Sequence, residues 1–263
     1  MPELPRGVSR ETCSPPAAPA GDALSSPDRR AQAALDGLAA RYGLAAPQRE
    51  QLRALLVVLA GDERAPTSVR TPERAVEVHL ADSLVALELE LVRSAGTIAD
   101  LGAGAGFPGL ALAVALDAHV WLVESQAKKC AYLREVLPLA LIQNASVACV
   151  RVEDWREGLG GSDVVVARAL APQSVVLEYA APLLRLGGAL VDWRGRRAPD
   201  DEQAALQAAA ELGLERSEIR RVEPFAGARD RHLHVYEKVR NTPDRFPRRA
   251  GVARKRPLGR PVG

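Results

Sequence analysis

The 263-residue chain is poor in aromatic residues and in cysteine, and each scarcity limits what it can be. Aromatic side chains make up 4% of the sequence, so the core must consist mainly of leucine, valine and alanine. The three cysteines, Cys13, Cys130 and Cys149, are odd in number and show no C-x-x-C spacing. The sequence therefore predicts neither a disulfide framework nor a zinc site, and it fits a reducing cytoplasm. Cys130 and Cys149 are expected to be small core residues.

Long apolar segments are also missing. No apolar run approaches 18 residues, and the N-terminus has no apolar core of signal-peptide length. We therefore expect no transmembrane helix, no export signal and a cytoplasmic location.

Apolar periodicity divides the first part of the chain into two segments. Residues 1–25 are rich in proline, alanine and serine, and they are expected to be a disordered tail. Residues 26–95 contain three amphipathic segments, which should form a helical cap. The expected helices begin at Ser26-Pro27, Pro47 and Thr71-Pro72; the first two end at Gly43 and Gly61, and the third carries an apolar stripe from Val76 to Leu91.

Residues 96–239 alternate short apolar strands with helices. This alternation predicts a mostly parallel sheet with helices on both faces. Two closing strands without a helix between them predict an antiparallel edge. The expected strands are 97–101, 119–124, 146–151, 163–167, 188–193, 215–223 and 231–238, with helices near 109–116, 127–140, 172–184 and 201–212.

Residues 98–112 join the first strand to its helix through a glycine-rich loop. The G-x-G-x-x-G pattern at residues 104–109 is typical of dinucleotide-binding loops, as in NAD-dependent oxidoreductases. Two carboxylates favour S-adenosylmethionine instead. Asp100 precedes the loop, where it would attract the ammonium of an amino-acid-bearing ligand and repel a pyrophosphate. Glu124 ends the second strand, where it could accept hydrogen bonds from ribose hydroxyls.

Other candidate ligand-binding residues follow from the sheet. A ligand of such a sheet binds at the carboxyl ends of the strands, which brings Val152, Glu153 and Arg168 to its edge. Phe107 is a bulky apolar residue inside the glycine loop and should form a wall of the site. The expected cofactor-binding residues are Asp100, Gly102, Gly104, Phe107, Glu124, Val152, Glu153 and Arg168.

Seven segments then carry a resemblance to a known family. They are HLADSL (79–84), ADLGAGAGFPGLALA (99–113), LVESQAKK (122–129), VRVEDW (150–155), ARALAP (167–172), DRHLHVYEK (230–238) and FPRRAGVARKRPLG (246–259). In this order they resemble the RsmG/GidB family of bacterial 16S ribosomal RNA guanine-N7 methyltransferases. The resemblance implies a class I, Rossmann-like methyltransferase with a mostly parallel seven-stranded sheet and a helical cap. It also implies S-adenosylmethionine as methyl donor and 16S ribosomal RNA, or the small ribosomal subunit, as acceptor.

Some positions depart from the family pattern. Glu124 stands where relatives usually have aspartate, and its extra methylene still reaches a ribose. Arg194-Gly195 replaces a common Lys-Gly and keeps the positive charge. Val78 stands where many relatives have arginine, so a cationic contact from this position is in doubt. Gln126-Ala127 replaces a usual Leu-Gly, which we interpret as loop variation.

Further residues are candidates for the acceptor side. His79, Asp82 and Ser83 lie near one helical face and should either line an acceptor pocket or lock the cap to the sheet. A hydrogen-bonded packing role for His79 is equally compatible with this spacing. His232 and His234 alternate on a strand, but no carboxylate pattern supports a metal site. The expected acceptor-side residues are His79, Asp82, Ser83, Arg194, Arg231, His232, Arg248, Arg249, Arg254, Lys255 and Arg256.

Residues 240–263 gather the positive charge. The net charge of the chain is +2, whereas this segment holds eight basic residues and one acid, a net of +7. Such a segment could bind phosphate groups without reading bases, or it could be a solvated end without function. We expect a basic disordered tail whose deletion weakens RNA binding and leaves cofactor affinity intact.

The expected chemistry needs no general base. Guanine N7 carries a free lone pair, so alignment with the activated methyl group suffices and no catalytic side chain is assigned. The sequence contains no Asp/Asn-Pro-Pro-aromatic tetrapeptide, the device that orients exocyclic amino groups. N7 lies in the deep groove of A-form RNA, so the acceptor should be unpaired. We expect a monomer; the alternatives are a non-catalytic RNA-binding or ribosome assembly factor, an NAD-dependent oxidoreductase, or a methyltransferase for a small molecule or protein.

Overall fold

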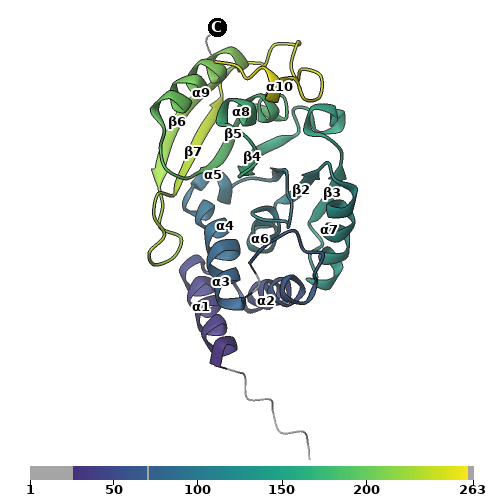
Figure 1. Cartoon of the computed structure of the whole chain (residues 1–263), viewed down its shortest axis with the longest axis vertical. Helices are drawn as coiled ribbons and strands as arrows, with labels where there is room; N and C mark the ends of the chain where they lie inside the picture. Colours follow the sequence, from purple (N-terminus) through teal and green to yellow (C-terminus); the bar gives the residue numbers. More distant parts are fainter. Residues whose placement is uncertain (1–25, 70, 260–263) are drawn as a thin grey trace, which may run out of the picture.

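A seven-stranded sheet forms the centre of the computed structural model, which describes residues 26–69 and 71–259 (Figure 1). The strand order is β3-β2-β1-β4-β5-β7-β6. The first five of these strands are parallel, and β7 is antiparallel to both β5 and β6, as predicted. The strands are β1 (Thr97–Leu101), β2 (His119–Glu124), β3 (Ala145–Cys149), β4 (Ser162–Arg168), β5 (Leu184–Arg194), β6 (Leu214–Arg221) and β7 (His232–Lys238).

Both faces of the central strands are buried, which explains their continuous apolar sequences. In β4, Val164 and Val166 pack into the core shared with the cap, whereas Val165 and Ala167 pack into the core of the opposite face. This alternation follows from the two-residue period of a strand. The helices after the strands are α6 (Gly109–Ala115), α7 (Ala127–Leu139), α8 (Gln173–Ala180) and α9 (Pro199–Leu212).

The cap shares one hydrophobic core with the face that carries α6 and α7. Its first two helices begin and end close to the predicted residues. The third predicted helix is broken, because it widens into a π-helical turn at Val76–Ala81 and tightens into a 3₁₀ turn at Val85–Glu88. The cap helices are α1 (Ser26–Tyr42), α2 (Ala46–Gly61), α3 (Pro72–Ala75), α4 (Asp82–Leu84) and α5 (Glu90–Arg93).

Side chains from outside the regular helical ladder account for the wide turn. The Arg168 guanidinium donates to the carbonyl of Val78 at 3.0 Å, and the Ser83 hydroxyl donates to the carbonyl of His79. Such competing donors disturb the i to i+4 bonding of a helix. Periodicity correctly predicts the buried stripe here, but it does not reveal the interruption.

The C-terminal segment is folded, contrary to the expectation of a disordered tail. Within residues 240–259, Phe246 and Ala253 are 7% and 1% exposed and pack into the core beside α8 and α9. Helix α10 (Val252–Lys255) lies near α8 in Figure 1. The segment folds because Phe246 and Ala253 lie between its basic residues and bury apolar surface. The free energy gained by this burial offsets the conformational entropy lost when the segment becomes ordered. Residues 260–263, like the expected N-terminal tail 1–25, lie outside the described residues.

The described part of the chain contains no helix with the length and apolar character needed to cross a bilayer.

Candidate active site

A pocket of about 270 Å³ opens at the carboxyl ends of β1 to β4. Its walls come from the loops that follow these strands and from α7, α8 and α10. This is the edge of the sheet at which the sequence predicts a ligand. The lining residues are Gly102, Val123, Glu124, Ser125, Gln126, Lys129, Val150, Arg151, Val152, Glu153, Ala169, Leu170, Tyr179 and Arg254.

The glycine loop approaches the pocket with its bare backbone. Gly102 has a φ of 68°, a conformation that residues with a side chain rarely adopt. A Cβ atom at this position would lie 2.5 Å from Leu170 Cδ1. The loop therefore requires glycine at this position, and the pocket beside it is free of loop side chains.

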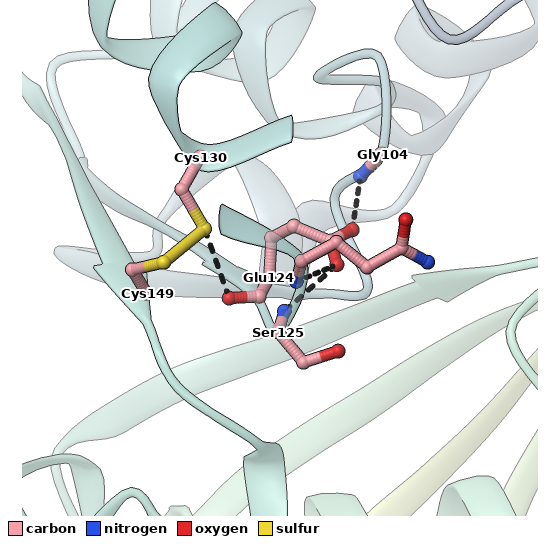
Figure 2. Close-up of a disulfide and its surroundings, with 6 residues drawn as sticks. Gly104, Glu124, Ser125, Cys130 and Cys149 are labelled. Carbon is pink, nitrogen blue, oxygen red and sulfur yellow. Dashed lines mark hydrogen bonds between the residues drawn. A yellow bond between two sulfur atoms is a disulfide. The ribbon is translucent and has the colours of Figure 1, made fainter. Parts of the chain in front are cut away.

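Glu124 is fixed in the pocket wall by the backbone (Figure 2). Its Oε1 accepts hydrogen bonds from the N–H groups of Ser125 and Gln126 at 2.7 and 2.8 Å, and its Oε2 accepts one from Gly104 at 3.2 Å. A carboxylate can accept about four hydrogen bonds, so a ribose hydroxyl could still bind to it. Gly104 thus acts on the site through Glu124.

The folded C-terminal segment closes one side of this pocket. Glu153 is 7% exposed, and its Oε1 accepts a hydrogen bond from the Gly251 N–H at 2.8 Å. The Arg254 guanidinium donates to the carbonyl of Leu170 at 3.0 Å. Burial, and then the charge of Glu153, raises the pKa of Tyr179 above its usual range. Sequence reasoning placed Arg254 only on the RNA side and missed Lys129 and Tyr179. Lys129 could have been found because it ends the LVESQAKK segment.

Asp100 does not take the place that the sequence predicts. Its side chain is buried, and its Oδ2 accepts a hydrogen bond from the Gly109 N–H at 2.8 Å, at the start of α6. Burial raises the pKa of this carboxyl to about 7. Asp100 therefore stabilises the loop-to-helix turn and is not among the residues that line the pocket.

Phe107 and His79 join the cap to the glycine loop. Their rings stack with centroids 4.8 Å apart, and His79 Nε2 lies 2.9 Å from Thr67 Oγ1. Burial, and then Arg168, lowers the pKa of His79 to about 4. Ser83 is fully buried beneath them. Of the two predicted roles for His79 and Ser83, these contacts favour locking the cap to the sheet. Phe107, predicted to form a wall of the ligand site, packs against His79 of the cap and is not among the residues that line the first pocket.

A second pocket, of about 480 Å³, adjoins the first. Ala169 lines both pockets, and its φ of 53° is a strained conformation of the kind that concentrates at functional sites. Arg168, predicted to contact the cofactor, lies in this second pocket instead. The lining residues are Val78, Asp82, Arg168, Ala169, Trp193, Arg194, Gly195 and Arg231.

Charged side chains in and beside the second pocket form ion pairs. Arg168 Nη1 donates to Asp82 Oδ2 at 2.9 Å, and Arg231 Nε lies 3.5 Å from Asp82 Oδ1. Arg194 Nε donates to Asp192 Oδ2 at 2.6 Å, and burial still raises the pKa of Asp192 to about 6. Asp82, Arg194 and Arg231, three residues that the sequence assigns to the acceptor side, thus line one pocket.

Comparison with known proteins identifies the family of this chain. Residues 48–233 match the family model described as GidB: rRNA small subunit methyltransferase G. The chain belongs to the GidB family. The ribosomal RNA small subunit methyltransferase G of Rubrobacter xylanophilus is 39% identical over 221 residues, which are 80% of this chain and 85% of that protein. The protein of the same name from Synechococcus elongatus is 35% identical over 81% of this chain and 90% of its own.

Solved structures support the fold of this GidB-family protein. Cofactor-bound Rv0187 from MTB matches with a TM-score of 0.50 at 20% identity, over 73% of this chain and 90% of that one. The predicted class I methyltransferase fold is confirmed. Family membership also confirms the predicted enzyme class, an S-adenosylmethionine-dependent methyltransferase.

The remaining predicted acceptor-side residues fall into three groups in this family member. Arg248 is committed to the fold, because its Nε donates to Glu178 Oε1 at 2.7 Å and Glu178 is 1% exposed. This contradicts an open RNA-contacting role for Arg248. His232 Nδ1 lies 2.9 Å from the carbonyl of Gly195 at the mouth of the second pocket. Four predicted cations of the C-terminal segment are exposed, namely Arg249, Arg254, Lys255 and Arg256.

Two cysteines pair beside Glu124, contrary to the expectation of unpaired core thiols. Cys130 of α7 and Cys149 of β3 form a disulfide, with Cα atoms 5.7 Å apart (Figure 2). Cys149 is opposite Glu124 in the strand register, and Cys130 Sγ lies 3.2 Å from the Glu124 carbonyl oxygen. The spacing of 19 residues gives no signal, because only the packing of α7 on β3 brings the two together. The bridge joins the α7 and β3 walls of the first pocket.

Proposed function

We propose that this enzyme transfers a methyl group from S-adenosylmethionine to N7 of a guanine in 16S ribosomal RNA. The observation that carries the proposal is a pair of pockets that share Ala169. One has a backbone-lined loop and a fixed carboxylate, and the other gathers arginines around a buried acid. The relatives at 35–39% identity are named ribosomal RNA small subunit methyltransferase G, which supports the choice of acceptor.

The residues of the first pocket fit the methyl donor. Gly102 meets the pocket with its backbone alone, because a Cβ atom there would lie 2.5 Å from Leu170 Cδ1. Glu124 is oriented to accept from ribose hydroxyls. Val152 and Glu153 lie at the adjoining strand end, where an adenine ring could rest. When bound, S-adenosylmethionine supplies a methyl group already activated by its sulfonium. The protein then needs to orient the bound ligand so that its methyl group faces the acceptor nitrogen.

The residues around the second pocket fit an RNA acceptor. Guanine N7 needs no deprotonation, so the reaction requires no general base. Glu124, Glu153 and Asp82 each have at least one carboxylate oxygen that accepts from a backbone N–H group or an arginine. Arg194 and Arg231 could bind the phosphates next to an unpaired nucleotide that enters the pocket. Exposed Arg249, Lys255 and Arg256 would extend this cationic surface. We expect the enzyme to act as a monomer in the cytoplasm, where small ribosomal subunits are found.

A methyl-transfer assay tests the proposal. The enzyme should transfer label from S-adenosylmethionine to small subunits that lack the modification, and mass mapping should locate it at N7 of one guanine in the 16S RNA. Glu124→Ala should lose the activity, whereas Glu157→Ala, an exposed acid, should retain it. Subunit binding without transfer would instead indicate an assembly factor. Binding of NADH, with no binding of S-adenosylhomocysteine, would indicate an oxidoreductase.

A further inference from the structure

The second pocket contains a buried carboxylate with one oxygen left over. Asp82 is 8% exposed and lines the pocket. Its Oδ2 accepts from Arg168 at 2.9 Å. Within residues 26–69 and 71–259, no hydrogen-bond donor reaches its buried Oδ1, and Arg231 is a loose ion-pair partner at 3.5 Å. A buried polar atom without a donor is costly unless a ligand satisfies it.

Asp82 is also held in place from behind. Trp193 Nε1 donates to the backbone carbonyl of Asp82 at 2.7 Å, and Trp193 lines the same pocket. Arg168 fixes the other carboxylate oxygen, so the free oxygen has one orientation. Flipped bases are commonly read by fixed polar groups next to an aromatic or apolar wall. The pocket supplies both features.

A free carboxylate oxygen selects among the purines. The Watson–Crick edge of guanine presents two donors, N1–H and the 2-amino group, that a carboxylate accepts. Adenine presents the lone pair of N1 there, which a carboxylate repels. N7 lies on the opposite edge of the guanine ring. A base bound to Asp82 by its Watson–Crick edge therefore turns N7 away from Asp82, toward the side of the pocket that Ala169 shares with the first pocket.

We propose that Asp82 is the specificity-determining residue for the acceptor, and that its Oδ1 reads the N1–H and 2-amino groups of a flipped guanine. This inference rests on the proposed function and adds the pocket and the group that select the base. Arg168 is a positioning residue that holds Asp82. Arg231, 41% exposed, is free to leave Asp82 for a phosphate of the incoming strand.

A double-change cycle, in which both Asp82 and the target nucleotide are altered, tests this proposal. The wild type and Asp82→Asn are each assayed on small-subunit RNA carrying guanosine or inosine at the target position. Inosine keeps N7 and N1–H but lacks the 2-amino group. In the wild type, inosine should lower kcat/KM about tenfold, the effect of one hydrogen bond to a charged group. In Asp82→Asn the two RNAs should differ by less than about twofold, because the amide oxygen stays with Arg168 and its NH₂ group faces the base.

Two controls separate reading from folding. Asp230→Asn changes an exposed acid on the neighbouring loop and should keep the wild-type ratio between the two RNAs. S-adenosylhomocysteine should bind Asp82→Asn within about twofold of the wild type, since Asp82 lies outside the first pocket. An equal loss on both RNAs in Asp82→Asn, or no inosine effect in the wild type, would overturn the inference alone. No transfer by the wild type to guanosine RNA would overturn the proposed function and this inference together.

Discussion

Replacing Arg248 with alanine should destabilise the fold by removing one partner of a buried ion pair. The partner, Glu178, has a side chain only 1% exposed, and Arg248 Nε donates to its Oε1 at 2.7 Å. Removing one member of such a pair leaves an uncompensated buried charge, which costs about 3–5 kcal/mol. The Arg248 side chain is 22% exposed, so water can enter after the change. We therefore expect the free energy of unfolding to fall by about 3 kcal/mol, the lower end of that range.

The same substitution should weaken cofactor binding. Arg248 anchors the segment from which Gly251 donates to Glu153 and Arg254 donates to the Leu170 carbonyl. Without the anchor, this wall of the first pocket loses its fixed position. We expect the affinity for S-adenosylhomocysteine to fall about tenfold, as for the loss of one hydrogen bond. Deletion of residues 241–263 should have at least this effect, which corrects the expectation of unchanged cofactor affinity.

Urea unfolding and calorimetric titration with S-adenosylhomocysteine measure the two effects. The matched control is Arg245→Ala in the same segment. Arg245 pairs with Glu211 at the surface, with side chains 60% and 39% exposed, and lies over the Phe246 ring. These exposed contacts are together worth about 1 kcal/mol. If Arg248→Ala is no less stable than Arg245→Ala and binds the ligand equally well, the Arg248–Glu178 pair neither anchors the C-terminal segment nor supports the first pocket.

Three further outcomes follow from the first pocket and its surroundings. Glu124→Ala should lower the calorimetric affinity for S-adenosylhomocysteine about 10- to 100-fold, because hydrogen bonds to a charged group are lost; an unchanged affinity would exclude Glu124 from ligand binding. Cys149→Ser should lower the free energy of unfolding in non-reducing urea by up to about 3 kcal/mol, the closure term of the loop between Cys130 and Cys149, and the difference should vanish with dithiothreitol. Asp100 binds its proton up to pH about 7 in the fold and only to about pH 4 when unfolded, so its contribution to stability falls as pH rises between these values. Relative to Asp100→Asn, the wild type should thus lose unfolding free energy from pH 4 to 7; parallel pH profiles would contradict this.

The sequence alone determined the layers of the fold and the centre of the first pocket. Strand positions follow from short apolar runs, and the cap helices begin where proline fixes the first turn. The glycine loop follows β1, and Glu124 is the last residue of the neighbouring parallel strand β2, so their meeting at one edge follows from local order and topology. Each of these features depends on residues that are close together in the chain.

The partners of side chains that meet over long sequence distances depend on the tertiary structure. Arg168 follows the predicted strand 163–167 and ends β4 in the structure, yet it pairs with Asp82 of the cap and so belongs to the second pocket. Cys130 meets Cys149 because α7 packs on β3. The basic C-terminal segment folds because Arg248 pairs with Glu178, and because Phe246 and Ala253 pack into the core beside α8 and α9. Spacing and charge do not specify these partners. They depend on which elements lie side by side in three dimensions, and on the buried charges that must be compensated there.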